Sequence, residues 1–163
     1  MSGVIRRALS IRQPWMFCIM ALDKRVENRE RADGKMPPMC RYRGELYLHA
    51  SSKRPSTEEL LCFEDLPWLD ATTVEAARRA MPVSGIVAVC DVIGHVEEGA
   101  RGAPVLCLDR EPSEPLNLED WWNGGFGLIL DNIRALAEPV ACNGALGLWK
   151  VPPEVAAAVE AQR

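Results

Sequence analysis

Residues 14–22, PWMFCIMAL, form the longest uninterrupted apolar run of the chain, and the charged segment LDKRVENRER follows at residues 22–31. A membrane-spanning helix needs about 20 apolar residues, so a run of this length predicts a helix buried within the protein. Because this helix is apolar on nearly every side, it must be covered on more than one face, for example by a sheet wrapped around it. The rest of the chain is therefore expected to fold around an early central helix.

Short apolar and β-branched segments on both sides of this helix predict strands. They lie at residues 7–11, 44–50, 84–96, 125–136 and 144–152, and residues 26–29 are also expected to be extended. Between the strands, capping-box patterns at 56–59 and 72–75 predict two short helices divided near Pro67. A last helix is expected at 153–162, where Pro153 begins it.

These elements predict one domain over residues 1–163, with a helical insertion at about 52–82 and an irregular acidic connection at about 97–118. The order of strands and helices favours an α+β fold, a small mixed or antiparallel β-barrel with flanking helices. A doubly wound α/β sheet is the rival. It would need regular strand–helix alternation and a glycine-rich phosphate loop, and the sequence has neither.

The charges are distributed unevenly along the chain. Residues 1–54 carry 12 Lys and Arg against 5 Asp and Glu, whereas residues 55–163 carry 7 against 18, within a net charge of −4. An anionic partner should therefore meet the first third of the chain. The alternative is that the two parts interleave in the fold, so that the charges mix on the surface.

The cysteines and histidines are sparse and scattered. The six cysteines lie 17 to 35 residues apart without a CxxC pair, and there are only two histidines, so we expect neither a disulfide framework nor a metal or other cofactor. The beginning of the chain has no apolar signal region, and no segment is long enough for a membrane span, so we expect a cytoplasmic protein without a membrane partner. The oligomeric state is left open by the sequence.

Lys24, Glu27 and Arg29 are the candidate functional residues of the charged segment. Lys24 and Arg29 can contact phosphate, while Glu27 can accept from a base amino group or fix Arg29 in a bidentate pair. The alternative is a surface ion pair worth about 0–1 kcal/mol, with Lys24 capping a helix. Asp91, a carboxylate embedded in a strand, is expected to need Lys24 or Arg29 as its partner.

Five segments in order resemble the ASCH domain, a member of the PUA-like superfamily. They are LSIRQPW (9–15), LDKRVENR (22–29), the strand ending in HAS (49–51), GIVAVCDV (85–92) and GALGLWKV (144–151). The second represents the family motif G-x-K-x-x-E-x-R. The glycine of its turn is missing, but Asp23 tolerates a left-handed conformation, so the turn geometry is expected to survive.

The resemblance implies a PUA-like β-barrel whose cleft, beside the early helix, holds RNA or a nucleotide between the side chains of Lys24, Glu27 and Arg29. It places further candidate ligand-binding residues nearby: Arg12, Gln13, Trp15, His49 and Ser51. Trp15 offers a ring for stacking a base, or is a plain core aromatic. His49 borders the cleft or is a hydrogen-bonded structural histidine.

One branch of the family comprises amidohydrolases of acetylated cytidine that use a lysine, a threonine three residues later and a distant glutamate. Lys24 matches the lysine, but Glu27 stands where that branch has threonine. If the chain is an enzyme, Lys24 and Glu27 are its candidate catalytic residues, with Asp91 as a third. We expect a binding module for RNA, a nucleotide or a nucleoside; amide hydrolysis comes second, followed by a ribonuclease or a protein-interaction domain.

Overall fold

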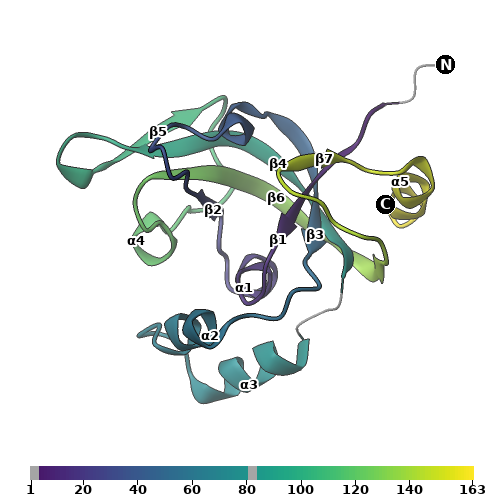
Figure 1. The fold of residues 1–163 in the computed structure, drawn as a ribbon, viewed down its shortest axis with the longest axis horizontal. Helices are drawn as coiled ribbons and strands as arrows, with labels where there is room; N and C mark the ends of the chain where they lie inside the picture. Colours follow the sequence, from purple (N-terminus) through teal and green to yellow (C-terminus); the bar gives the residue numbers. More distant parts are fainter. Residues whose placement is uncertain (1–3, 81–83) are drawn as a thin grey trace.

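The computed structural model describes residues 4–80 and 84–163, and these form an α+β fold (Figure 1). The strands are β1 (Arg7–Ile11), β2 (Val26–Arg29), β3 (Gly44–Ala50), β4 (Gly85–Glu98), β5 (Pro104–Leu108), β6 (Phe126–Val140) and β7 (Leu148–Lys150). The α-helices are α1 (Trp15–Ala21), α2 (Thr57–Glu64), α3 (Ala71–Ala80), α4 (Leu118–Trp121) and α5 (Pro153–Glu160). None of the helices in these two ranges is both long and apolar enough to cross a membrane.

The seven strands make one mixed sheet. Its order is β2-β6-β4-β3-β1-β7, with β5 paired to β4 outside this path. β1 runs parallel to β3, and every other pairing is antiparallel. The sheet curves over α1 (Figure 1). β2 is at one end of this order, so the ladder is not closed into a ring, and only the α+β class of the prediction is confirmed.

Helix α1 packs between the sheet and the helical insertion, as its apolar sequence predicted. Met16 and Ile19 belong to the main core inside the sheet. Cys18 belongs to a second core that includes Phe63 of α2. The ring of Phe17 meets the ring of Phe63 edge to face, with centroids 6.3 Å apart. Sheet and insertion therefore cover different faces of the same helix.

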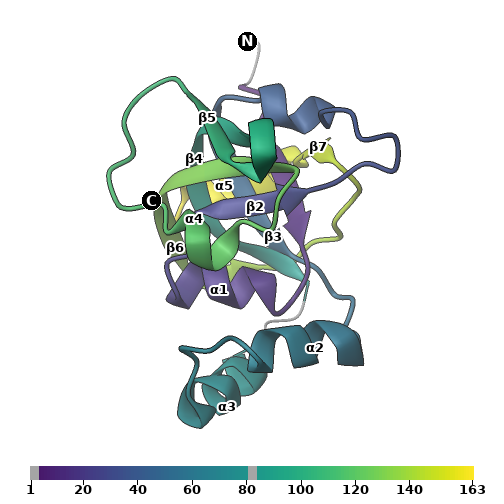
Figure 2. The same cartoon turned by 90° about the vertical axis from the view of Figure 1, so that its left-hand side faces the viewer.

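The insertion consists of the two predicted helices, and Figure 2 shows them below α1. Helix α2 begins with the predicted capping box, in which Ser56 and Glu59 exchange hydrogen bonds. The second predicted capping box is wrong: Asp70 accepts from the backbone N–H of Thr73 at 2.7 Å and caps α3. Residues 81 and 82, where the predicted insertion ends, lie outside the described residues.

The connection predicted to be irregular at 97–118 is partly a strand. β4 continues to Glu98, and β5 pairs with its end, with Val105 opposite Glu97. The glycines and prolines of this connection obscured the short apolar segment PVLCL, which forms β5. At the start of β6, a Cβ on Gly127 would lie 2.6 Å from the side chain of Val26 on β2. Strand β2 therefore approaches β6 closely at this point.

Candidate functional site

The three charged side chains of the motif form one connected chain along β2. Asp23 takes the left-handed conformation that the sequence predicted, with φ 55°, and so turns the chain from α1 towards β2. Lys24 is only 2% exposed; its ammonium donates to the carbonyl of Val26 and lies 3.2 Å from Oε2 of Glu27. The other carboxylate oxygen of Glu27 lies 3.0 Å from the guanidinium of Arg29. Glu27 thus holds both cations.

This chain spans two strands that do not pair with each other. The guanidinium of Arg29 on β2 donates to the backbone carbonyl of Ser10 on β1 at 3.4 Å. β7 covers β1 from Arg7 to Leu9, so Ser10 lies beyond the paired part of that edge. The motif therefore bridges the opening between β2 and β1.

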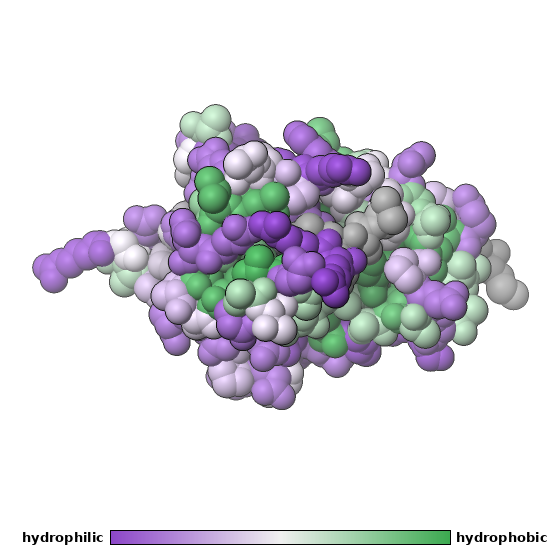
Figure 3. Space-filling model, turned by 90° about the horizontal axis from the view of Figure 1, so that it is seen from below, coloured by the Kyte–Doolittle hydropathy of each residue, from purple (hydrophilic) through white to green (hydrophobic). Residues whose placement is uncertain are grey.

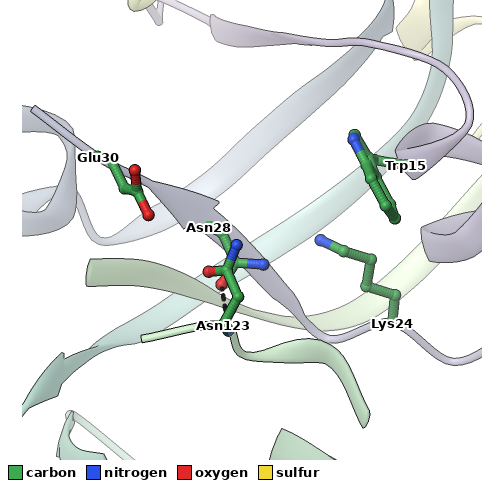
Figure 4. Close-up of a pocket in the computed structure, with 5 residues that line it drawn as sticks. All are labelled: Trp15, Lys24, Asn28, Glu30 and Asn123. Atoms are coloured by element: carbon green, nitrogen blue, oxygen red, sulfur yellow. Dashed lines mark hydrogen bonds between the residues drawn. The ribbon is translucent and has the colours of Figure 1, made fainter. Parts of the chain in front are cut away.

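A cleft of about 310 Å³ lies next to this chain (Figure 4). It is lined by Trp15, Lys24, Asn28, Glu30 and Asn123. The Lys24 amine lies below the Trp15 ring and points into the cleft towards the two asparagines, and Glu30 lies beyond them. Sequence reasoning identified Trp15 and Lys24. It missed Asn28 and Glu30, which belong to the same charged segment, and Asn123, for which the sequence carried no signal.

The wall of the cleft that carries Asn123 is fixed from two strands. Asn28 on β2 donates to the carbonyl of Trp121 at 2.8 Å, and its Oδ1 accepts from the backbone N–H of Asn123 at 3.5 Å. On the other side, Glu98 of β4 accepts from the backbone N–H of Gly125 at 3.0 Å. The turn that follows α4 is therefore positioned before any ligand arrives.

Arg12 and Gln13 lie at the start of α1. Gln13 is 2% exposed, and its Oε1 accepts from the backbone N–H of Phe17 at 3.0 Å. The guanidinium of Arg12 pairs with Glu59 of α2 at 2.8 Å. Within the described residues, Nε2 of Gln13 and Nε of Arg12 are buried without a hydrogen-bond partner. Neither residue lines the cleft.

His49 and Ser51 are also away from the cleft lining. His49 is buried; its Nε2 lies 3.1 Å from the carbonyl of Cys142, and its ring packs edge to face on Trp149. Burial lowers the pKa of His49, which keeps the imidazole neutral. The backbone N–H of Ser51 donates to Ile11 at 2.9 Å. The contacts of His49 are those of a hydrogen-bonded structural histidine, the alternative that the sequence left open.

The predicted partner of Asp91 is wrong. Its carboxylate lies 3.6 Å from the guanidinium of Arg110 and 3.7 Å from that of Arg134. These arginines follow Asp91 by 19 and 43 residues, so their proximity depends on the tertiary fold. Asp91 is not joined to Lys24 or Arg29 by an ion pair in the described structure, so a catalytic role together with Lys24 has no support in this geometry.

Asp131 is a buried carboxylate that sequence reasoning missed. It lies opposite Asp91 in the β4–β6 register and is 1% exposed. Its side chain accepts from Arg110, and from the hydroxyl of Ser113 at 2.5 Å. Burial alone would raise the pKa of Asp131, but the hydrogen bonds from Ser113 and Arg110 outweigh it and lower that pKa. Asp131 therefore fastens the segment after β5 to the sheet.

The basic and acidic parts of the chain interleave in the fold. Arg12 pairs with Glu59, and Arg43 with Asp109 at 3.2 Å. The face that is seen from below in Figure 3 carries hydrophilic residues interspersed with hydrophobic ones. The cleft itself has one cation and one carboxylate in its lining, from Lys24 and Glu30. Its charge is therefore nearly balanced, unlike that of a groove built for a phosphate backbone alone.

The six cysteines are free thiols. Cys18 lies next to the motif, because its carbonyl accepts from the backbone N–H of Lys24 at 3.2 Å. Burial raises the pKa of the Cys18 thiol to about 12, which leaves it protonated and a poor nucleophile. Within residues 4–80 and 84–163, no cluster of three or more His, Cys, Asp or Glu side chains is arranged to hold a metal ion.

The cleft brings together an aromatic ring, an ammonium, two side-chain amides and a carboxylate. This set can stack a planar ring and form hydrogen bonds around its edge. Neither the protein-family models nor the curated proteins contain a match to the chain. The function is therefore inferred from the residues of the cleft and from the sequence segments around them.

Proposed function

We propose that this chain is an ASCH-domain protein that binds RNA or a nucleotide in the cleft beside α1. One observation carries the proposal: the Lys24 ammonium and the Trp15 indole open on the same cleft, whose volume of about 310 Å³ suits a single nucleoside (Figure 4). The two residues are nine positions apart in the sequence and are brought together by α1 and the turn at Asp23.

A base stacked on Trp15 would gain about 1–3 kcal/mol, the range observed for base–aromatic stacking. Lys24 has three N–H donors, and within the described residues two of them reach Val26 and Glu27. The third is available to a base carbonyl or a phosphate. The amide groups of Asn28 and Asn123 offer donors and acceptors to the base edge.

The proposed fold is a PUA-like barrel with an opening between β2 and β1. The hydrogen bond from Arg29 to Ser10 supports this proposal, because it links β2, one end of the sheet order, to the part of β1 that β7 does not pair with. A barrel with such an opening keeps backbone groups accessible beside the ligand. Two residues of the motif then have different roles: Arg29 links β2 to β1, and Lys24 faces the cleft.

The proposal is tested by titrating the protein with uridine 5′-monophosphate and with a short single-stranded RNA while tryptophan fluorescence is recorded. Trp15→Ala should weaken binding about 5- to 150-fold, the equivalent of the lost stacking energy. Lys24→Met should weaken it as well and lower the salt slope for RNA by about 1. Lys53→Met, at an exposed lysine outside the cleft lining, is the matched control. No binding by the wild type at low salt contradicts the proposal.

A second candidate function is hydrolysis of an amide on a modified nucleoside. It is favoured by the buried Lys24–Glu27 pair, whose two charged groups lie 3.2 Å apart at the edge of the cleft. The pair could transfer a proton, but Glu27 stands at the position where the hydrolytic branch has a threonine, so the hydroxyl nucleophile is missing. Acetate release from N4-acetylcytidine, compared between the wild type and Lys24→Met, tests this function. Equal rates in the two proteins exclude it.

A further inference from the structure

The helical insertion contacts the side chain of Arg12 through the carboxylate of Glu59. Oε2 of Glu59 lies 2.8 Å from the guanidinium of Arg12 and also accepts from the backbone N–H of Ser56 at 2.7 Å. Glu59 thus completes the capping box of α2 and pairs with an arginine outside the insertion. The side chain of Arg12 is 40% exposed, so molecules in solution can reach it.

Arg12 belongs to the same turn as Trp15, one of the residues that line the cleft. The carbonyl of Arg12 accepts from the backbone N–H of Met16 at 3.1 Å, so Arg12 forms the start of the α1 turn that positions the Trp15 ring. In the described part of the chain, Nε of Arg12 has no hydrogen-bond partner, although it is buried. Among the described residues, Glu59 accepts only from Nη2 of this guanidinium, so the other terminal nitrogen remains for a second acceptor.

The insertion also contacts the opposite wall of the cleft. Trp68, between α2 and α3, packs edge to face on Trp121 with ring centroids 4.9 Å apart. The carbonyl of Trp121 accepts the hydrogen bond from Asn28, which lines the cleft. The insertion therefore touches both the turn that carries Trp15 and the turn that carries Asn123.

We propose that Glu59 occupies a phosphate-binding position on Arg12, and that the phosphate of a bound nucleotide displaces it and loosens α2. This inference rests on the proposed function, because it takes the nucleoside to lie in the cleft. Carboxylates and phosphates bind guanidinium through the same pair of N–H groups, so one can replace the other. Glu59 of the insertion thus competes with the phosphate for the guanidinium of Arg12.

The exposure of the ion pair makes this exchange feasible. A partly exposed pair is weak, because solvent screens it and both side chains lose freedom when they pair. A phosphomonoester carries up to two charges and three acceptor oxygens, whereas the Glu59 carboxylate carries one charge. Glu59 keeps its hydrogen bond to Ser56 when Arg12 is released. Helix α2 therefore retains its N-terminal cap and loses only the ion pair that joins it to Arg12.

Glu59→Gln is the informative variant, and Glu58→Gln is its matched control. Both remove one negative charge from the first turn of α2, but only Glu59 contacts Arg12. Glutamine at position 59 preserves the capping box, so the helix should remain folded. The ligands are uridine 5′-monophosphate and uridine, which differ only in the phosphate.

Glu59→Gln should tighten binding of the monophosphate about 3- to 10-fold and leave uridine binding unchanged, whereas Glu58→Gln should change neither. In the wild type, the monophosphate should accelerate amide hydrogen exchange in residues 57–64, and uridine should not. If both ligands bind but the two variants behave alike, the competition by Glu59 is refuted while the proposed function stands.

If neither ligand binds to any of the proteins, the proposed function fails. The position on Arg12 is then tested with inorganic phosphate at high concentration, with chloride at equal ionic strength as the control. Faster exchange in residues 57–64 of the wild type, absent in Arg12→Gln, would support the anion position by itself. Unchanged exchange would refute it.

Discussion

Glu27 should contribute more to stability than any other charged residue of the motif. Its carboxylate is 7% exposed and lies 3.2 Å from the Lys24 ammonium and 3.0 Å from the Arg29 guanidinium. Replacing Glu27 by leucine leaves a buried lysine without a counter-ion and removes the carboxylate that Arg29 contacts. The variant should therefore be strongly destabilised, although leucine itself suits a buried position.

The magnitude follows from the geometry. At an effective dielectric constant of about 20, opposite charges about 3 Å apart attract by about 5 kcal/mol, and desolvation offsets much of this gain. Breaking a buried pair by removing one partner costs about 3–5 kcal/mol, so we expect that loss for Glu27→Leu. Lys24→Met should cost less, because Glu27 keeps Arg29, whose side chain is 25% exposed.

Urea unfolding followed by tryptophan fluorescence measures these differences. Glu30→Gln, on the same segment but at an exposed position, is the control and should change stability by less than about 0.5 kcal/mol. The double variant Lys24→Met with Glu27→Leu should be more stable than the sum of the single effects predicts, by about 1–3 kcal/mol. A Glu27→Leu protein as stable as the Glu30→Gln control would refute the buried network.

Three further predictions concern residues away from the cleft. The pKa of Asp131 is lowered in the folded state, so its ionised carboxylate contributes its full stabilisation above the ordinary pKa of about 3.9. This contribution is lost as pH falls through the lower pKa of the folded state. The free energy of unfolding of Asp131→Asn, measured against pH, should lack this loss. The pKa of His49 is also lowered in the folded state, so below about pH 6.5 His49 is protonated in the unfolded state before it is protonated in the folded state. The free energy of unfolding should therefore fall as pH drops below this value, and His49→Gln should show a smaller fall. Gly144→Ala should cost about 1–3 kcal/mol in urea unfolding, because its Cβ would lie 2.5 Å from the His49 ring. The Cβ of Gly147→Ala would have no atom of the described residues within 4 Å, so this variant should cost only about 1 kcal/mol, for its positive φ.

Local signals explain why much of the fold could be predicted from the sequence. Strand β3 alternates so that Leu46 and Tyr47 enter different cores, and the capping box at Ser56 places the start of α2 where the sequence predicts it. Asp23 takes the left-handed conformation expected of a short polar side chain. In each case the information lies within a few neighbouring residues.

The errors at the candidate site concern partners that are distant in the chain. The sequence predicts Lys24 or Arg29 as the partner of Asp91, but the register between β4 and β6 brings Asp91 close to Arg134 instead. Asn123 enters the cleft because Asn28 binds the turn after α4, 95 residues away in sequence. Spacing within a segment cannot predict such contacts, since they depend on which strands become neighbours. The sequence therefore predicted Trp15 and Lys24 of the cleft lining but not the turn that carries Asn123.

The arrangement around Glu27 favours binding over catalysis. A threonine at this position would place a hydroxyl next to Lys24, whereas the carboxylate draws the Lys24 ammonium and the Arg29 guanidinium into one ion-paired chain. The lysine is thereby held as a hydrogen-bond donor at the cleft rather than as a base for a nucleophile. Stability and ligand contact are then divided between two residues, so Lys24→Met should lose affinity with a modest loss of stability, while Glu27→Leu loses both. If Lys24 instead served as the base of an enzyme, both variants would lose turnover, and affinity and stability would not be separated in this way.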